Sequence, residues 1–346
     1  MSFVPKIRLP KSCQADAPWR FSFKDWLRVI KLTGAEIEHD NVPVIAAGVA
    51  FFSLLAVFPL ITACLSIFGY FADPIAVEQQ LSAVSSVLPR EAWEILDTQI
   101  KAVTNAPNKG LGLGILFGLS LALYSAGSGI RAMMRAMNVA YGEREKRGLI
   151  QFYALAIGLT VSVTFFMFAS LAVIVGVPAL LSFIRLDGAA QWLARYMPWI
   201  ILVWIFAFAT ATLYRIGPSR RQAKFRWIMP GVIFATVAWM GMSSLFSLFV
   251  AEFSTYNKTY GSLSAVIILL IWFWLTAFVV IVGAELNAEL ERHTCVDTTR
   301  GPKRPIGARG AAMADYRHPE PGDAAASAQS LKPETEPTDR EDQPIV

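Results

Sequence analysis

The sequence predicts an all-α, polytopic membrane protein with about six transmembrane helices and several short amphipathic helices. Hydrophobic residues make up 55% of the 346 residues and charged residues only 16%, whereas a soluble domain is typically about 25% charged. Six stretches contain no Asp, Glu, Lys or Arg and reach the length of about 20 residues that a helix needs to cross a bilayer. Lys and Arg gather in alternate intervals between these stretches. This composition excludes an ordinary soluble enzyme and a largely disordered chain.

Residues 1–41 form the predicted N-terminal segment, which carries one amphipathic helix. Apolar residues recur there at helical spacing, while basic residues occupy the opposite face. The apolar set is Phe23, Trp26, Leu27 and Ile30, and the basic set is Lys24, Arg28 and Lys31. Ser22 and Asp25 fit a capping box at the start of the helix. We expect this helix either to lie on the inner leaflet or to pack on the ends of the spans.

A transmembrane domain is predicted over residues 42–292. Its six spans cover residues 42–72, 111–130, 149–180, 196–214, 227–251 and 259–284. Counted near the span ends, from Ser22 to Gly310, the intervals on one side hold 18 Lys and Arg and those on the other side hold 6. Because basic residues favour the cytoplasmic side, both termini are expected in the cytoplasm. The first span is expected to act as an uncleaved signal anchor.

Segments outside the spans carry three further predictions. Two apolar stripes separated by Pro89 predict two short amphipathic helices in the first outer loop. From residue 293 the chain is rich in Pro, Ala, Glu, Asp and Ser, so residues 293–346 are expected to form a disordered cytoplasmic tail. Cys13 and Cys295 fall on the cytoplasmic side, where we expect them to stay reduced as plain small residues.

Small residues recur at steps of four along the second span. They are Gly110, Gly114, Gly118, Ala122 and Ala126. The resulting groove either lets another helix approach closely or forms a pore or substrate groove. Pro59, deep in the first span, removes one backbone donor and should kink that helix, either for packing or to line a transport site. The candidate hinge or groove residues are Pro59, Gly110, Gly114, Gly118, Tyr260 and Gly261.

Polar residues emerge at one membrane level, where the second and sixth spans end. This candidate cluster consists of Arg131, Arg135, Asn138, Glu285, Asn287 and Glu289. We expect one of the two arginines to form an ion pair with one of the two glutamates and so lock the inner end of the bundle. The alternatives are a site for an anion or lipid headgroup at the arginines and a proton-linked gate at Glu285.

The residues give little support for enzyme chemistry. The three histidines, His39, His293 and His318, show no metal-ligand spacing, and no HxxxH, CxxC or phosphate-binding loop occurs. We therefore expect no catalytic residue, no metal, no cofactor and no cleavage of RNA. The expected partners are the lipid bilayer, anionic lipid headgroups and a second copy of the chain, but not nucleic acid.

Several segments resemble the YihY/BrkB family of bacterial inner-membrane proteins. They are residues 46–60, 124–131, 136–142, 230–231, 256–264 and 283–290. The most specific are Tyr260-Gly-Ser-Leu263 and Gly283-Ala-Glu-Leu-Asn-Ala-Glu289. The resemblance covers about residues 35–292. It implies a six-helix fold in the bacterial inner membrane.

The resemblance implies little chemistry. The family has carried the label of a tRNA-processing ribonuclease, regarded as a misassignment, and that of a virulence factor linked to serum resistance. Transport has been suggested for it without a settled substrate. No catalytic residues are established in the family, so none is carried over to this chain.

Three classes of function are therefore weighed. The first is a protein that transports or exports an ion, a small molecule or a lipid, which a water-accessible polar cavity between the spans would favour. The second is an envelope scaffold or assembly factor without transport, which a solidly packed apolar bundle would favour. The third is an enzyme such as a ribonuclease, which a surface cluster of three or more metal-capable residues would favour.

Overall fold

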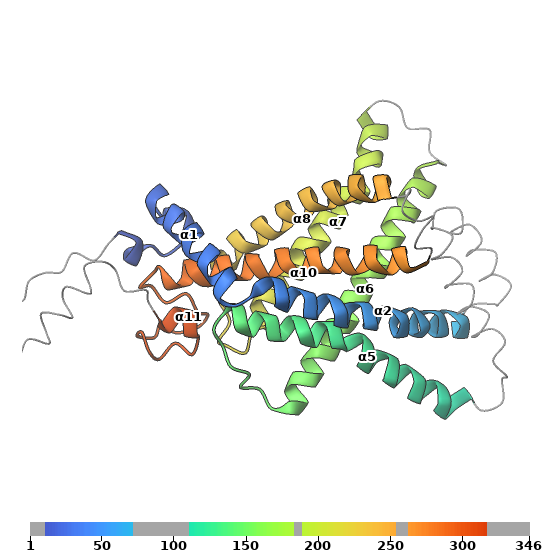
Figure 1. The fold of residues 1–346 in the computed structure, drawn as a ribbon, viewed down its shortest axis with the longest axis horizontal. Coiled ribbons are helices and arrows are strands. Elements are labelled where there is room, and N and C mark those ends of the chain that lie inside the picture. The colour runs from blue at the N-terminus through green and yellow to red at the C-terminus, as the bar shows by residue number, and fades with distance from the viewer. Residues whose placement is uncertain (1–10, 72–110, 183–188, 254–261, 317–346) are drawn as a thin grey trace, which may run out of the picture.

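The structure is a computed structural model that describes residues 11–71, 111–182, 189–253 and 262–316. Its described residues form an all-helical bundle (Figure 1), which confirms the predicted fold class. The long helices are α2 (Val42–Phe71), α5 (Leu111–Ala140), α6 (Leu149–Ser182), α7 (Ala189–Ile216), α8 (Phe225–Phe253) and α10 (Ser262–Arg292). The short ones are η1 (Lys11–Gln14), η2 (Pro18–Arg20), α1 (Phe23–His39) and α11 (Ala312–Asp315).

Each long helix corresponds to one predicted span. Two helices run well past the apolar stretch that predicted them: α5 continues from residue 130 to Ala140, and α10 continues from residue 284 to Arg292. The added turns carry the polar residues of the predicted cluster, which find partners within the protein and so need not leave the helix.

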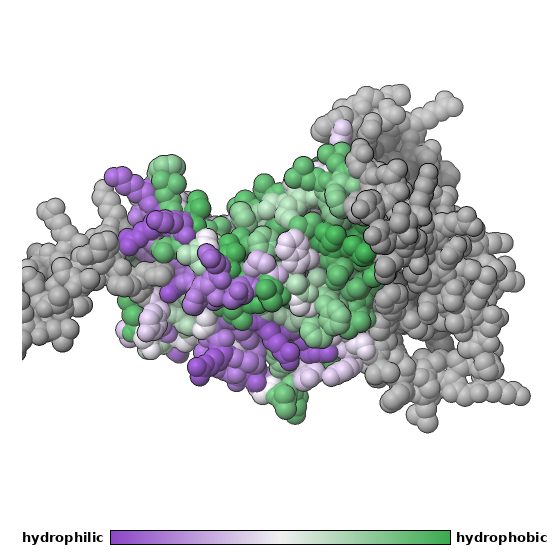
Figure 2. Space-filling model, in the orientation of Figure 1, coloured by the Kyte–Doolittle hydropathy of each residue, from purple (hydrophilic) through white to green (hydrophobic). Residues whose placement is uncertain are grey.

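Length and hydropathy support several membrane crossings. Within the described residues, four stretches satisfy both criteria: Leu149–Phe166, Tyr196–Ile216, Phe225–Val250 and Val266–Arg292. A fifth arises if α1 and the following Val42–Val57, bent by 62°, count as one span. Figure 2 shows hydrophobic residues over the long helices and hydrophilic residues at the end that carries α1 and α11. We call this end, with the C-terminal ends of α5 and α10, the polar end.

Helix α1 has the predicted capping box. Ser22 Oγ accepts a hydrogen bond from Asp25 N at 3.3 Å, and Asp25 Oδ2 accepts one from Ser22 N at 3.0 Å. The helix packs on the ends of the long helices, which is one of its two expected placements, and its contact with the inner leaflet stays a prediction. Val29 is buried with Trp227 and Leu290 at the polar end, whereas apolar side chains of the other face remain exposed. These are Phe23 (78%), Leu27 (52%) and Ile30 (57%), and such an apolar stripe beside a basic face suits the surface of a bilayer.

Two glycines bring α8 and α10 into backbone contact. A Cβ added to Gly231 would collide with the carbonyl oxygen of Gly283, so neither helix tolerates a larger residue there. Gly231 follows Pro230, which lies inside α8 and lacks a backbone N–H. Asn287 bonds the backbone on both sides of this proline: Oδ1 accepts from Gly231 N at 2.8 Å, and Nδ2 donates to Ile228 O at 3.1 Å.

The prediction of a disordered tail from residue 293 is wrong for residues 293–316. Arg309 is buried and donates to Ala314 O at 2.8 Å and to Cys295 O at 2.5 Å. Asp297 accepts hydrogen bonds from the backbone N–H groups of Thr299 and Arg304, both at 2.9 Å. The polar composition misled because these side chains bind backbone groups of the same segment instead of water. Residues 317–346 lie outside the described residues.

The expectation of two reduced, unrelated cysteines is also wrong. Cys13 and Cys295 form a disulfide with a Cα–Cα distance of 4.6 Å. Cys295 N donates to Cys13 O at 3.0 Å, and Thr294 Oγ1 donates to Ala15 O at 2.7 Å. The N-terminal segment and the start of the tail therefore run side by side at the polar end, a pairing across 282 residues that no local pattern predicts.

Candidate functional site

The six residues of the predicted polar cluster do not form one cluster. The structure distributes Arg131, Arg135, Asn138, Glu285, Asn287 and Glu289 over separate places at the polar end, as their partners show. Five of the six are buried, and Arg135 is exposed. Each of the separate places has its own chemistry.

Arg131 lies between α5 and α6 among aromatic rings. Its guanidinium carbon lies 4.6 Å from the ring centre of Tyr124 and 5.3 Å from that of Tyr153. Nη1 donates to Tyr124 O at 3.0 Å. A Cβ built on Gly127 would lie 2.8 Å from Arg131 Nη1 and 3.4 Å from Thr160 Oγ1, so this glycine leaves room for the guanidinium beside Thr160. Cation–π contacts of this kind stabilise an arginine that has left water.

The expected ion pair between Arg131 or Arg135 and Glu285 or Glu289 is wrong. Within the described part of the chain, no ion pair joins either arginine to either glutamate. Glu289 instead pairs with Arg292 of its own helix at 2.7 Å. The reason is direction: the arginines of α5 face α6, as the contacts of Arg131 with Tyr153 and of Arg135 with Phe152 show, whereas Glu285 faces Asp40 at the end of α1.

A buried ion pair does lock the polar end, through residues that the sequence did not single out. Arg220 binds Glu291 through two hydrogen bonds of 3.0 and 2.7 Å, and their side chains are 1% and 0% exposed. Thr298 Oγ1 donates to Glu291 at 2.8 Å, and the guanidinium of Arg220 lies 3.9 Å from the ring centre of Tyr141. A charge that is removed from water needs such a paired, hydrogen-bonded partner.

The two asparagines of the predicted cluster form hydrogen bonds with backbone groups of other segments. Asn138 Oδ1 accepts from Ser219 N at 2.7 Å, and its Nδ2 donates to Glu145 Oε2 at 3.0 Å. Asn138 thus ties the end of α5 to the segment between α7 and α8, as Asn287 ties α10 to α8. Glu145 also binds Arg147, and this hydrogen bond lowers the pKa of the Glu145 carboxyl to about 2.

The predicted hinge and groove residues are tested only in part. Gly110, Tyr260 and Gly261 lie outside the described residues, as does the first outer loop with its two predicted helices. Gly114 and Gly118 lie within α5, and α2 continues through Pro59 to Phe71. Close helix contact does occur further along α5, where a Cβ on Gly129 would lie 2.8 Å from Ser53 Oγ and 3.1 Å from Ser53 Cα of α2.

A central cavity of about 410 Å³ lies between α2, α5, α6, α7 and α10. Apolar side chains and short hydroxyl side chains form its wall. The hydroxyl residues are Ser53, Thr160, Ser162, Thr164, Thr210, Thr212 and Thr276. Thr160 and Thr212 donate to carbonyl oxygens of their own helices at 2.7 and 2.8 Å, so they present mainly their methyl groups. No charged residue of the described chain lines this cavity.

A second cavity, the basic pocket, opens at the polar end with a volume of about 570 Å³. Its wall contains several cationic side chains: Lys146, Arg147, Arg215, Arg220 and Arg221. Three of them form ion pairs: Lys146 binds Glu143 and Arg147 binds Glu145, both at 2.7 Å, and Arg220 binds Glu291. Arg221 donates through Nη2 to Pro302 O at 3.0 Å, while its Nη1 is buried without a hydrogen-bond partner. A pocket of this chemistry suits an anion such as a lipid headgroup.

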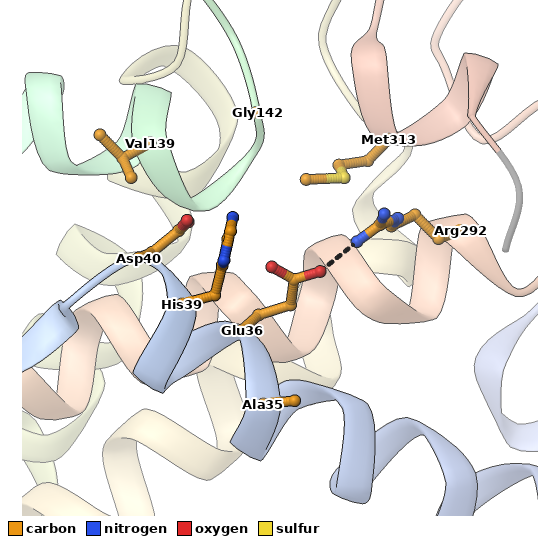
Figure 3. Close-up of a pocket in the computed structure, with 8 residues that line it drawn as sticks. All are labelled: Ala35, Glu36, His39, Asp40, Val139, Gly142, Arg292 and Met313. Atoms are coloured by element: carbon orange, nitrogen blue, oxygen red, sulfur yellow. Dashed lines mark hydrogen bonds and ion pairs between the residues drawn. The ribbon is translucent and has the colours of Figure 1, made fainter.

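A third cavity, the acidic pocket, lies between the end of α1, the end of α5, α10 and α11 and has a volume of about 580 Å³. Figure 3 shows Glu36, His39 and Asp40 projecting from the end of α1 toward the turn after α5. The possible ligand atoms of these three residues lie within 4.8 Å of one another. Burial, followed by the charge of Glu36, raises the pKa of Asp40.

Sequence reasoning missed this group of metal-capable residues. The spacing of the histidines does not predict His39 as a metal ligand, because no second histidine lies at a ligand spacing. The signal was the run Glu36-Ile-Glu-His39-Asp40, whose outer members recur three and four residues apart and therefore share one helix face. The third side chain, Asp40, comes from the residue that ends the helix.

Comparison with known proteins identifies the relatives of this chain. A family model described as "Virulence factor BrkB" matches residues 33–306. A Bacillus subtilis protein, YfkH, whose name describes it as ribonuclease-like, is 31% identical over 260 residues, which cover 71% of this chain and 89% of that protein. A UPF0761 membrane protein of Idiomarina loihiensis is 25% identical over 285 residues, which cover 80% and 95%. No solved structure matches the chain.

Proposed function

We propose that this chain, which belongs to the virulence factor BrkB family of membrane proteins, binds an anionic amphiphile in the central cavity and carries it across the membrane. The observation that carries the proposal is the central cavity, which five long helices line. Its wall is apolar and is not the water-accessible polar wall that would favour a polar solute, so the proposed ligand has a hydrocarbon chain. The cavity volume of about 410 Å³ falls within the range of about 300–1,000 Å³ that is usual for small-molecule sites.

The wall of the central cavity favours a hydrocarbon chain over an inorganic ion. An ion that enters must exchange its water shell for polar groups of the protein. The wall offers hydroxyl groups, of which those of Thr160 and Thr212 already donate within their own helices. An acyl or isoprenoid chain has no water shell to lose on entering such a space, and the apolar wall resembles the hydrocarbon interior of the bilayer from which the chain comes.

Arg131 supports the choice of an anionic amphiphile. Its Nη1 lies beside Thr160, which lines the central cavity, and Gly129 and Ile130 of the same helix turn line it as well. A guanidinium has five donors, and the described contacts of Arg131 use one of them for Tyr124 O. The other donors suit a phosphate or carboxylate headgroup.

We further propose that the protein lies in the bacterial inner membrane with the polar end in the cytoplasm. The support is the excess of 18 over 6 basic residues on the side that includes the polar end. The basic pocket then faces the leaflet in which anionic headgroups attract cationic segments. Reporter fusions at Gly310 and Gln99 test this orientation, and an external signal at Gly310 would contradict it.

The experiment is reconstitution of the purified full chain into liposomes with fluorescently labelled lipids, read as the rate at which label changes leaflet. Ala209→Phe fills the central cavity, whereas Ala154→Phe adds the same bulk on an exposed face of α6. We expect Ala209→Phe to slow the exchange of labelled phosphatidylglycerol about tenfold, equivalent to about 1.4 kcal/mol, and Ala154→Phe to leave it unchanged. Equal rates for both variants, or no exchange above that of empty liposomes, would refute the proposal.

Arg131 provides a second test of the ligand's charge. Arg131→Gln removes the cation, and Arg131→Lys keeps it. With Arg131→Gln, we expect the preference for labelled phosphatidylglycerol over labelled phosphatidylcholine to disappear, and with Arg131→Lys we expect part of it to remain. An unchanged preference in Arg131→Gln would show that another group recognises the headgroup.

An envelope scaffold without transport is the second candidate. The buried pair of Arg220 and Glu291 and the tight contact of Gly231 with Gly283 favour it, because both immobilise the polar end. A stable reconstituted protein that exchanges no lipid would support this candidate.

An enzyme is the third candidate, and the metal-capable group in the acidic pocket meets the criterion stated for it above. We nevertheless propose that the chain does not cleave RNA. The support is the sequence, which offers no defensible pairing of a nucleophile with a base. Precursor tRNA should stay intact with purified protein and Mg²⁺, Mn²⁺ or Zn²⁺. Cleavage that follows the protein through two purification steps would overturn this proposal.

A further inference from the structure

The end of α1 brings three different ligand-bearing side chains together. Glu36 and His39 lie on one face of the last helical turn, and Asp40 caps it. Asn41 then adopts φ 52°, a left-handed conformation that turns the chain sharply into α2. The result is a carboxylate, an imidazole and a second carboxylate whose ligand atoms lie within 4.8 Å of one another, at the mouth of the acidic pocket (Figure 3).

A fourth side chain reaches this group from α10. Glu285 is 1% exposed, and its carboxyl lies close enough to that of Asp40 for the two groups to influence each other electrostatically. The Glu285 oxygen Oε1 is buried without a hydrogen-bond partner. A buried carboxylate next to another carboxylate needs a proton or a cation between them, because both like-charge repulsion and loss of water act against it.

The cation nearest to this group is already engaged. Arg292 Nη1 binds Glu36 Oε1 at 2.6 Å and Glu289 Oε1 at 2.7 Å. Among the described residues, no ion pair reaches Asp40 or Glu285. The acidic charge around Asp40 therefore exceeds the basic charge that binds it.

We propose that Glu36, His39 and Asp40 bind one divalent transition-metal ion of the Mn²⁺ or Zn²⁺ class, next to the buried carboxylate of Glu285. Carboxylate oxygen suits Mn²⁺ and imidazole nitrogen suits Zn²⁺, whereas Mg²⁺ and Ca²⁺ favour oxygen alone. Glu36 offers the oxygen that Arg292 leaves, and exposed His39 gives an incoming ion its first ligand. The ion offsets the acidic charge between the end of α1 and α10 and so fixes the angle at which α1 meets the bundle.

The test uses the full chain in detergent after removal of metal with EDTA. Mn²⁺ is titrated and its free fraction is followed by electron paramagnetic resonance, and Zn²⁺ is titrated by calorimetry. We expect saturation at one ion per chain. His39→Gln, at an exposed position, and Asp40→Asn should each weaken Mn²⁺ binding about tenfold or more. Glu38→Gln is the matched control, because Glu38 is an exposed carboxylate of the same helix; its affinity should equal that of the unaltered chain.

Folding and cysteine ligation are separated from metal binding by two further measurements. The melting temperature without metal shows whether each variant is folded, and His39→Gln should keep that of the parent. Zn²⁺ is titrated in parallel into Cys13→Ser. Zn²⁺ binding that is lost in Cys13→Ser but kept in His39→Gln would assign the metal to the cysteines and overturn the proposal. Equal Mn²⁺ affinity in His39→Gln, Asp40→Asn and Glu38→Gln, or no saturable binding, would overturn it too.

Discussion

The polar end and the middle of the bundle follow opposite designs, although the same long helices build both. At the polar end, specific partners bind several buried charges and amides, as Arg220 with Glu291 and Asn287 with the backbone beside Pro230 show. In the middle, short hydroxyl and apolar side chains leave a cavity of about 410 Å³. Matched buried polar groups tolerate one arrangement only, whereas an apolar cavity can fit ligands of different shapes. The polar end therefore fixes the positions of the helices, whereas the middle of the bundle leaves space for the ligand proposed above.

Breaking the buried ion pair should give the largest effect. Arg220→Ala leaves Glu291 charged and unpaired at a position with 0% side-chain exposure. We expect a loss of about 3–5 kcal/mol of stability, because the remaining charge cannot return to water. The measurement is thermal unfolding in detergent. Arg144→Ala is the control, since Arg144 is an exposed arginine between α5 and α6, and it should change stability by less than about 0.5 kcal/mol. A similar melting temperature for both variants would show that the ion pair of Arg220 and Glu291 does not stabilise the polar end.

Two glycines of α8 sharpen the comparison within a single helix. Gly231→Ala places a methyl group against the carbonyl oxygen of Gly283, whereas Gly241→Ala meets nothing within 4 Å. We expect Gly231→Ala to cost about 1–3 kcal/mol through forced separation of α8 and α10. Gly241→Ala should instead stabilise by about 0.5–1 kcal/mol, the usual gain for this change inside a helix. The measurement is thermal unfolding of the two variants. A loss of stability in both would show that the close contact of Gly231 with Gly283 is not the cause.

The ordered part of the tail should depend on Asp297. Hydrogen bonds from Thr299 and Arg304 outweigh burial and lower the pKa of Asp297. A carboxyl whose folded-state pKa is lowered stabilises the protein above its unfolded-state pKa, and this stability is lost as the pH falls through the folded-state pKa. Asp297→Ala should release residues 293–316 and cost about 1–3 kcal/mol of local stability. The measurement is limited proteolysis near Arg304, and Asp25→Ala, at the start of α1, is the control. Equal cleavage rates in Asp297→Ala and Asp25→Ala would show that Asp297 does not hold residues 293–316 in their ordered conformation.

The sequence predicted the bundle because apolar length and charge asymmetry are local properties. The six long helices, the capping box at Ser22 and the polar character of the helix ends all follow from residues close in the chain. The partners at the polar end do not. Arg131 was assigned to the wrong neighbour because the facing direction of α5 depends on helix packing, which the hydropathy pattern leaves open. Arg220 with Glu291 and Cys13 with Cys295 unite segments far apart, so neither pair could be read from spacing.

The smallest expected effect concerns Asp40, the one acidic residue at the junction of α1 and α2 whose raised pKa can be followed by titration. Burial and the charge of Glu36 raise this pKa, while His39 and Arg292 act in the opposite direction. A carboxyl with a raised folded-state pKa stabilises the folded protein only at low pH, and this stability is lost as the pH rises from the unfolded-state value through the folded-state value. In EDTA, the unaltered chain should therefore lose a small part of its stability as the pH rises above the usual Asp range of about 4. Asp40→Asn should remove this loss, and Glu38→Gln should keep it. If Asp40→Asn keeps the pH dependence of the unaltered chain, another titrating group causes the loss of stability, and burial of the Asp40 carboxylate at the end of α1 does not destabilise the folded protein.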